Sequence, residues 1–550
     1  MTREDRRALL WVVGSAAVMV GVDLGRRILT TNDEARFPLL AQDILTRGDW
    51  LFPILNGSVY HNKPILLAWL ITLVSWPIGH VTQFTAVIPS ALAAFAMALL
   101  IFGLGREMFG AEAGMYAALI AVTMQGTFLH GRIPMPDMLM TAFITASLWM
   151  LWRMARGARQ AWIGFYVFVA LAFWAKGPGG FLPLIVAFAW AAASRRSASW
   201  RALRLPLGLP LLAVIVAPWP LVRLFHHAEG LRQAVVQNQL FWYLPHELRP
   251  GMVAEPIQNA FGILFPWVFV VPVVLVEAAR LLRRRGADNN AVFCDAVSLL
   301  MMSLVTMFVV IALSQQQRFR YYLPLVAPVA LLSGWWAESA VRGRVALKIP
   351  WRVCAAVGVL LVAAGIAGAF SRRNALNEVA TVWPAYLAQA IVLAATVGAV
   401  AVALLVGARD RRLLHAFTAA WVGCAVLVVS SYHWELERRN AAYDYAGLNE
   451  RMKPILRETP VVATLGLADM PLAFYLRRPV VAAGTASNLR EVVRADSQAV
   501  AIVTDRALTS LEDRDGFTVL MHDRLALRPI VVVGYRTTSP TRPGIRGVTP

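Results

Sequence analysis

Long apolar runs separated by short polar loops make up most of the first 430 residues. Each run approaches or reaches the length that an α-helix needs to cross a bilayer. The fourteen runs are 9–24, 64–80, 84–104, 111–129, 138–152, 161–175, 180–193, 205–222, 257–278, 297–313, 321–338, 353–370, 384–407 and 413–431. The pattern predicts an α-helical polytopic membrane protein.

The pattern changes after Ser431. Short β-like runs alternate there with helical stretches such as Tyr443–Arg457, which is typical of a small α/β domain. The β-like runs are Val461–Leu465, Ala499–Val503, Val519–Met521 and Ile530–Val533. We therefore predict a transmembrane domain over 1–432, an α/β domain over 433–538 and, because it is rich in Pro, Thr and Arg, a disordered tail over 539–550.

The basic residues cluster in short loops, which predicts the topology through the positive-inside rule. The strongest basic loops are Arg153–Arg159, Arg195–Arg204, Arg280–Arg285, Arg342–Lys348 and Arg409–Arg412. Two apolar runs lie between successive loops, so all five can share the cytoplasmic side with the basic N-terminus. This requires one early run not to cross. The best choice is 64–80, which is short and contains Pro64 and Pro77, and which we expect to lie in the interface.

The prediction is thus about thirteen spans, with the α/β domain outside the membrane. A hydrophobic fraction of 58% with only 15% charged residues excludes an ordinary soluble protein. Nucleic-acid binding is not expected, because the net charge of +20 is spread over loops and forms no compact basic domain. The three cysteines have neither metal-ligand nor disulfide-framework spacing.

The stretch Thr30–Lys63 is the only long polar run in the first hundred residues. Long ordered loops of this kind are usually functional. It carries the acidic pair Asp33 and Glu34, together with Arg36 and Lys63. The acidic pair could simply cap a helix. The next predicted outer loop offers a second carboxylate, Asp137, which favours a shared site in which carboxylates orient hydroxyls, accept a proton or hold a divalent cation.

Several cations fall on the predicted outer side, where the sign rule expects few. They are Lys63, Arg132, Lys176, Arg318 and Arg320. Each alone could lie at a helix end with its head group in water, but together they suit an anionic lipid, because guanidinium groups bind phosphate in a bidentate manner. Tyr321 is either a tyrosine of the interfacial belt or a donor to phosphate.

A third outer loop, 223–256, contains His226, His227, His246, Glu247 and several aromatic residues. A metal site, a sugar-binding surface and an interfacial anchor all remain open, because no ligand spacing fixes a metal. A divalent metal is thus possible and its ligands unknown. The chain has no glycine-rich nucleotide loop in a credible context, so a membrane-dissolved donor is the natural substrate for group transfer.

The polar motifs resemble those of one family in order and spacing. They are Asp33-Glu-Ala-Arg36, Gly48-Asp-Trp50, Tyr60 to Lys63-Pro64, Arg132 with Asp137, Lys176-Gly-Pro178 and Tyr321-Tyr-Leu-Pro324. The family is the polyprenyl-phosphate-sugar-dependent glycosyltransferases of the GT-C fold. The likeness is greatest to the lipid A aminoarabinose transferases (ArnT-like) and to protein O-mannosyltransferase-like enzymes. One difference is Asn62, where the aminoarabinose transferases usually have an acidic residue before the lysine.

The resemblance implies the GT-C fold, with juxtamembrane helices in the first outer loop and a periplasmic C-terminal domain. It implies an inner-membrane enzyme that takes a sugar from undecaprenyl phosphate, with lipid A or another envelope glycan as acceptor. Asp33 then resembles the principal catalytic acidic residue, with Asp137 second and Glu34 beside it. Lys63 and Tyr321 resemble ligands of the lipid phosphate, assisted by Arg318 or Arg320. Arg36, Tyr60, Arg132 and Lys176 complete the expected substrate site.

Two other functions are compatible with the sequence. A protein O-glycosyltransferase would transfer to Ser or Thr, and Asp33 would then have to remove a proton. A flippase for lipid-linked sugars would need charges in the middle of its spans, and the predicted spans have few.

Overall fold

The computed structural model describes residues 2–194, 197–226, 253–283, 291–344, 413–457, 459, 461–495, 498–509 and 516–535. The predicted spans 353–370 and 384–407, most of the loop 223–256 and the predicted tail 539–550 lie outside these residues.

The described chain is mainly helical, as the apolar pattern predicts. Its helices up to residue 226 are α1 (Arg3–Gly21), α2 (Asn32–Arg47), α3 (Leu66–Ser75), α4 (Gln83–Phe109), α5 (Ala111–Val122), α6 (Gln125–His130), α7 (Pro136–Ala155), α8 (Ala161–Lys176), α9 (Leu182–Ser194), α10 (Ser197–Ala202), α11 (Leu205–Val216) and α12 (Pro218–His226). Those that follow are α15 (Ala254–Leu264), α16 (Val271–Arg283), α17 (Ala291–Ala312), α18 (Val326–Val341) and α21 (Leu413–Ala442). Short 3₁₀ turns include η4 (Trp267–Phe269) and η5 (Phe319–Leu325).

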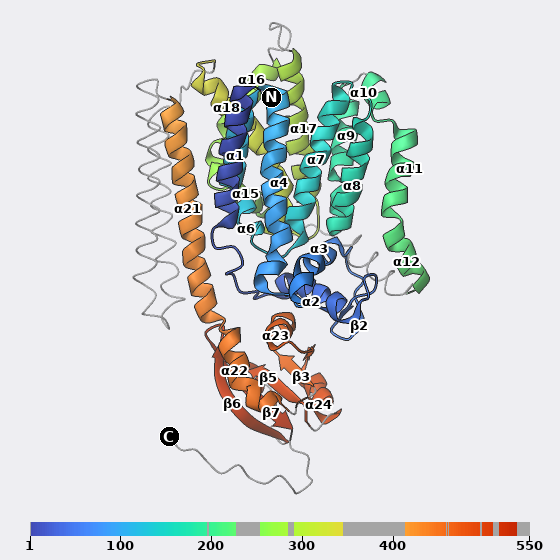
Figure 1. Ribbon diagram of the computed structural model, residues 1–550, viewed down its shortest axis with the longest axis vertical. Coiled ribbons are helices and arrows are strands. Elements are labelled where there is room, and N and C mark those ends of the chain that lie inside the picture. Colours follow the sequence, from blue (N-terminus) through green and yellow to red (C-terminus); the bar gives the residue numbers. More distant parts are fainter. Residues whose placement is uncertain are drawn as a thin grey trace. The chain divides into compact units, whose positions relative to one another are not determined.

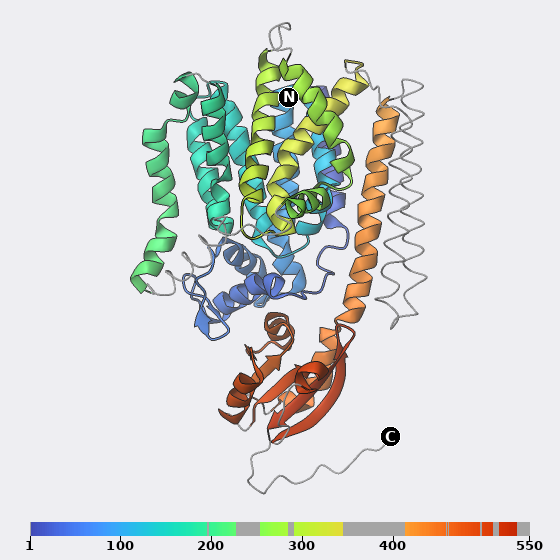
Figure 2. The same ribbon diagram turned by 180° about the vertical axis from the view of Figure 1, so that it is seen from behind.

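Contacts divide the chain into two units, residues 1–27 with 60–436 and residues 28–59 with 437–550. In the first unit, α4, α7, α8 and α9 lie side by side with nearly parallel axes (Figures 1 and 2). Five helices of the described chain are long and apolar enough to cross a membrane. They lie within Gln83–Phe109, Pro136–Ala155, Ser199–Val222, Val292–Ala312 and Phe417–Leu456. The first unit is thus a multi-pass membrane bundle.

Helix α3 agrees with the prediction that the run 64–80 does not cross the bilayer. It has only 10 residues, which at the α-helical rise span about 15 Å, half of the hydrocarbon thickness. The 3₁₀ turn Trp76–Ile78 follows it, with Pro77 at a first-turn position. A juxtamembrane helix in the first outer loop is the architecture that the sequence predicts.

Two predicted spans are each interrupted by a short segment that is not α-helical, and these two segments are joined by hydrogen bonds. The run 111–129 divides at Thr123 into α5 and α6, and the run 257–278 divides at Pro266 into α15 and α16. The Gln125 backbone N–H donates to the Phe265 carbonyl at 2.7 Å, and the Trp267 indole donates to the Thr123 hydroxyl at 2.8 Å. Backbone groups released by a break in an apolar bundle need such partners.

The second unit contains a five-stranded mixed sheet of order β4-β3-β5-β7-β6. Its strands are β3 (Val462–Leu465), β4 (Val480–Ala482), β5 (Val500–Thr504), β6 (Phe517–Leu525) and β7 (Arg528–Tyr535). β3 pairs in parallel with β4 and β5, whereas β7 pairs antiparallel with β5 and β6. The helices are α22 (Tyr445–Leu456), α23 (Asp469–Leu476), α24 (Ala486–Ala495) and α25 (Asp505–Thr509). This is the small α/β domain that the C-terminal pattern predicts.

Alternation along β5 shows how the sheet is covered on both faces. Val500 and Ile502 join the core that contains Leu448 of α22 and Leu472 of α23. Ala501 and Val503 join a second core that contains Leu489 of α24. Successive residues of a strand point to opposite faces, so helices are needed on both sides.

The second unit also takes in residues 28–59, which the sequence analysis assigned to the transmembrane domain. They contribute α2 and the hairpin of β1 (Ile54–Leu55) and β2 (Ser58–Val59). The division thus differs from the predicted boundary at 432. The reason is long-range pairing between this segment and the chain after Glu437, which no local pattern shows.

Candidate active site

A buried polar cluster joins two helices and a 3₁₀ turn of the first unit. The Lys176 ammonium forms an ion pair with the Asp137 carboxylate, and both side chains are at most 3% exposed. Arg320 Nε lies 3.8 Å from the other Asp137 oxygen. The Tyr321 ring lies beside both cations, with its centroid 4.2 Å from Lys176 Nζ and 5.7 Å from Arg320 Cζ.

The sequence around each member explains its place. Helix α7 begins at Pro136, and Asp137 follows in its first turn, where proline fits and a carboxylate is favoured by the helix dipole. Lys176 is the last residue of α8, which Gly177 ends with a φ of +96°, a value that favours glycine. A short loop connects α7 to α8, so the start of one lies beside the end of the other.

Gln317 fixes the turn that carries Arg320 and Tyr321. Its side-chain amide donates to the carbonyls of Ile311, Ala312 and Ser314 at 3.1, 3.1 and 2.7 Å. Its side-chain oxygen accepts from the Tyr322 hydroxyl at 2.6 Å. The end of α17 and the start of η5 are thereby joined, because the last carbonyls of a helix need partners outside it.

Two ion pairs of the cluster join two cations to one carboxylate. Lys176 and Arg320 bring two positive charges, and Asp137 brings one negative charge. A cation that is largely buried attracts an anion more strongly than an exposed one, since the interaction is screened less there than in water. Lys176 and Arg320 thus give the cluster two groups of the kind that bind an anion.

His130 is a neighbour that the sequence reasoning missed. Its Nδ1 lies 2.9 Å from the Gly126 carbonyl, and because a carbonyl can only accept, Nδ1 carries the proton. Its ring stacks on Phe319, the residue before Arg320, at 5.8 Å. Burial lowers the pKa of His130, and the nearby Asp137 carboxylate opposes this. Its position at the start of the predicted outer loop 130–137 was the available signal.

The hydrogen bonds of Arg132 all go to backbone carbonyls. Its guanidinium donates to the carbonyls of Met19, Val22 and Phe128. Two of these carbonyls lie at the end of α1, where helix carbonyls lack partners. The side chain is 1% exposed. These bonds join α1 to the start of the 130–137 loop, and they are the role that the structure gives this residue.

Arg318 lies in a different place from Arg320. It is exposed and lines a polar cleft of about 270 Å³ with Gln316, Gln317 and the α15 residues Glu255, Gln258 and Asn259. Of the two arginines predicted to assist phosphate binding, Arg320 is the one that joins Asp137.

Tyr60 and Lys63 precede α3 in the first unit. Tyr60 is buried and Lys63 is partly exposed. The Trp69 ring of α3 lies 5.4 Å from the Trp174 ring of α8. Since Trp174 is two residues before Lys176, α3 packs on the end of α8 that carries the cluster. The contribution of Tyr60 and Lys63 to phosphate binding stays a prediction.

The three remaining predicted residues lie on α2, in the second unit. Arg36 forms an ion pair with Asp33 at 3.0 Å, and both side chains are partly exposed. Glu34 is buried and accepts the Thr30 backbone N–H at 2.8 Å, which gives it a local structural function. Thr31 caps the helix. The participation of Asp33, Glu34 and Arg36 in the site stays a prediction.

The described residues contain no group of three or more His, Cys, Asp or Glu side chains that could hold a metal ion. The candidate metal ligands between His227 and Glu247 lie outside the described residues.

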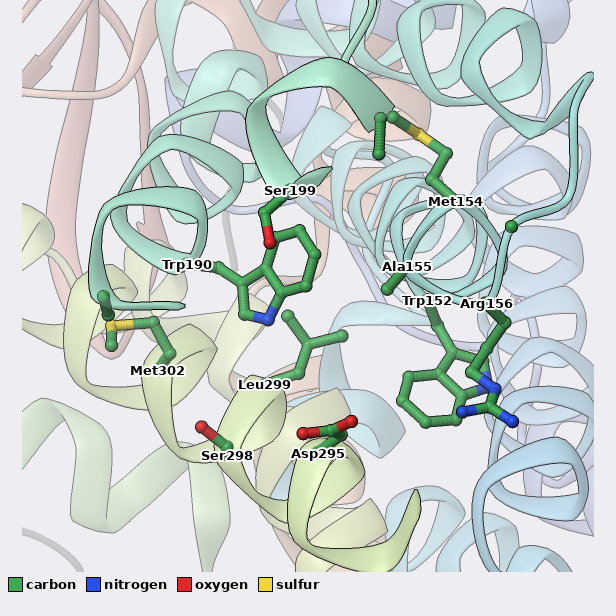
Figure 3. Close-up of a pocket in the computed structure, with 13 residues that line it drawn as sticks. Trp152, Met154, Ala155, Arg156, Trp190, Ser199, Asp295, Ser298, Leu299 and Met302 are labelled. Carbon is green, nitrogen blue, oxygen red and sulfur yellow. The ribbon is translucent and has the colours of Figure 1, made fainter. Parts of the chain in front are cut away.

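A separate pocket of about 400 Å³ lies at the other end of α7 (Figure 3). Trp152, Arg156, Trp190 and Asp295 are among its lining residues. The 20 residues of α7 separate it from Asp137 by roughly 25–30 Å. This pocket is therefore no part of the polar cluster.

Comparisons with known proteins agree with this architecture. Residues 62–221 match the family described as dolichyl-phosphate-mannose-protein mannosyltransferase. Undecaprenyl phosphate-alpha-4-amino-4-deoxy-L-arabinose arabinosyl transferase of Edwardsiella ictaluri is 26% identical over 63% of this chain and 64% of its own length. The protein of that name from Pectobacterium atrosepticum is 27% identical over 64% of this chain and 63% of its own length. The matched part thus spans a little under two thirds of these relatives.

Two solved structures share the fold. ArnT from Cupriavidus metallidurans bound to undecaprenyl phosphate has a TM-score of 0.73 at 18% identity, over 98% of this chain and 99% of its own. The Archaeoglobus fulgidus oligosaccharyltransferase has a TM-score of 0.55 at 13% identity, over 90% of this chain and 69% of its own. The predicted GT-C fold is confirmed.

Proposed function

We infer that this chain, which is ArnT-like in sequence and in fold, is a membrane glycosyltransferase that moves a sugar from a polyprenyl phosphate to an acceptor of the bacterial envelope. The observation that carries the proposal is the cluster of Asp137, Lys176, Arg320 and Tyr321, in which two cations and a phenol lie side by side. It supports a donor that carries a phosphate. The relatives named for undecaprenyl phosphate-aminoarabinose transfer support a polyprenyl donor and lipid A as acceptor.

In the proposed reaction an acceptor oxygen attacks the anomeric carbon of the sugar. The bond from that carbon to the phosphate oxygen breaks, and the polyprenyl phosphate leaves with the electron pair. Lys63, Arg320 and Tyr321 stabilise the negative charge that develops on this phosphate, which is often the largest catalytic contribution. Asp137 holds Lys176 beside the Tyr321 ring.

Asp33 acts on the acceptor. A hydroxyl acceptor must lose its proton, and Asp33 accepts it. A phosphate acceptor is already ionised, so Asp33 then only orients it. Since the sign of the basic loops predicts that the cluster lies on the outer side, the reaction takes place at the periplasmic face of the inner membrane.

Profiling of the envelope tests the function directly. Lipid A and periplasmic glycoproteins of a deletion strain are compared with those of the parent by mass spectrometry. Loss of a sugar from lipid A supports the proposal, and loss from Ser or Thr of periplasmic proteins identifies the protein O-glycosyltransferase instead. Movement of lipid-linked sugar across vesicles by the purified protein, without a new glycosidic bond, would identify a flippase.

Arg320→Ala is expected to raise the KM for the polyprenyl-phosphate donor roughly 10- to 100-fold, the range set by one charge-assisted hydrogen bond. Initial rates at varied donor concentration measure it. Arg342→Ala is the matched control, because Arg342 lies at the opposite end of α18 and pairs with Glu112 and Glu338. An equal KM for the two variants would remove Arg320 from the donor site.

A further inference from the structure

We propose that the C-terminal part of the chain is a positioning clamp for helix α2, with Asp469 as the residue that fixes the start of this helix beside Asp33. The inference rests on the proposed function, in which Asp33 acts on the acceptor. It gives the α/β domain a role in the reaction, and it involves contacts within the second unit alone.

Asp469 joins two separate parts of the 28–59 segment. Its Oδ1 accepts from the Asn32 side-chain amide at 2.7 Å, and its Oδ2 accepts from the Asn56 side-chain amide. Asn32 in turn accepts the Met470 backbone N–H through its Oδ1 at 3.2 Å. Asn32 is the first residue of α2, and Asp469 is the first residue of α23. The two helix starts are thus joined reciprocally.

Asp469 is only 5% exposed. Both of its oxygens are used by amides from the 28–59 segment, and a buried carboxylate without partners would be costly. The amides of Asn32 and Asn56 therefore offset the cost of burying this carboxylate. The contact specifies a position for the start of α2.

The backbone just before α2 is held by the same part of the chain. The Ile28 N–H donates to the Asn440 side chain at 3.3 Å, and the Leu29 N–H donates to the Tyr475 hydroxyl at 2.8 Å. Arg439 donates to the Thr30 hydroxyl at 2.5 Å. Residues more than 400 positions later in the sequence thus form hydrogen bonds with Ile28, Leu29, Thr30 and Asn32.

Asp33 directly follows the clamped residue. A shift of the α2 start by about 1 Å moves its carboxylate by a similar distance, and misplacement of that size can reduce a rate roughly 100-fold. The ion pair between Arg36 and Asp33 is part of the same helix, so it moves with α2 and cannot correct such a shift. The position of Asp33 therefore depends on Asp469.

A reciprocal exchange tests the clamp. Asp469→Asn alone leaves one oxygen at position 469 for the two amides of Asn32 and Asn56, so one of these hydrogen bonds is lost in their present orientation. Asn32→Asp alone places two carboxylates opposite each other. In the Asn32→Asp/Asp469→Asn double variant, the new carboxylate at position 32 accepts from the new amide at position 469 and from the Met470 N–H. The oxygen of that new amide accepts from Asn56. All three hydrogen bonds are retained, and the net charge is unchanged.

Each single variant is expected to lower kcat roughly 10- to 100-fold, with the KM for the polyprenyl-phosphate donor within about twofold of wild type. The double variant is expected to regain kcat to within about threefold. Purified full-length protein is assayed with varied donor, and kcat is normalised to the folded fraction. Arg451→Ala is the control in the same unit, because it breaks the exposed ion pair with Asp523 and leaves α2 untouched.

Single variants with wild-type kcat, or a double variant as slow as its parents, would overturn the clamp. The clamp would also be overturned if each single variant lost the same amount of kcat, per degree of lowered melting temperature, as Arg451→Ala does. A wild-type protein without transfer activity would instead contradict the proposed function, and the two failures are therefore distinguishable.

Discussion

Asp33→Asn is expected to lower transfer roughly 100- to 10,000-fold, the usual contribution of one acid–base group. The substitution keeps the shape of the side chain and removes only the carboxylate that we propose to act on the acceptor. Transfer of sugar from polyprenyl phosphate by the purified variant measures the loss.

Asp43→Asn is the control for this variant. It removes an ion pair with Arg47 on the same helix, ten residues from Asp33, and it should transfer at close to the wild-type rate. Full activity of Asp33→Asn would remove the catalytic role of this residue.

The size of the loss also separates the acceptors. A hydroxyl of Ser or Thr needs proton removal, whereas a lipid A phosphate does not. The loss should therefore approach the upper end of the range with a hydroxyl acceptor and be smaller with a phosphate.

Asp137→Ala is expected to destabilise the protein by about 3–5 kcal/mol, because it leaves the Lys176 ammonium buried without its carboxylate. Lys176→Met should cost less, because Arg320 remains 3.8 Å from Asp137 and compensates part of the charge. The Asp137→Ala/Lys176→Met double variant should be more stable than the sum of the two losses predicts, since no unpaired charge from this pair remains.

Thermal unfolding of the three purified variants in detergent measures this cycle. Additive losses would mean that the ion pair contributes no coupling. Breaking the exposed pair of Arg153 and Glu107 serves as the reference, since surface pairs contribute at most about 1 kcal/mol.

Most strands of the C-terminal domain could be predicted from the sequence, because each buried strand is itself a short run of apolar residues. The predicted runs Val461–Leu465, Ala499–Val503, Val519–Met521 and Ile530–Val533 correspond to β3, β5, β6 and β7. β4 was not predicted, since Val480–Ala482 is only three residues long, which is too short for an alternating pattern to be recognised.

The candidate site was predictable in part, because charged residues stand out in a chain this apolar. Asp137, Lys176, Arg320 and Tyr321 were chosen from their places near helix ends, and the structure brings these four together. The sequence did not show which of these residues contact one another, since the contacts depend on the packing of α7 against α8 and on the turn fixed by Gln317. The folded structure also directs Arg318 to a cleft away from Asp137. It places the Arg132 guanidinium at the carbonyls that end α1.

The amino-acid sequence by itself determined that this is a helical membrane protein with an α/β domain. Burial in the bilayer or in a core requires apolar residues in a regular pattern, and this pattern is visible within each helix or strand on its own. Only the tertiary structure decided that the breaks at Thr123 and Pro266 meet and that Asp469 holds Asn32. Such contacts join residues up to 446 positions apart, so they depend on the folded arrangement of helices and strands and not on any local pattern.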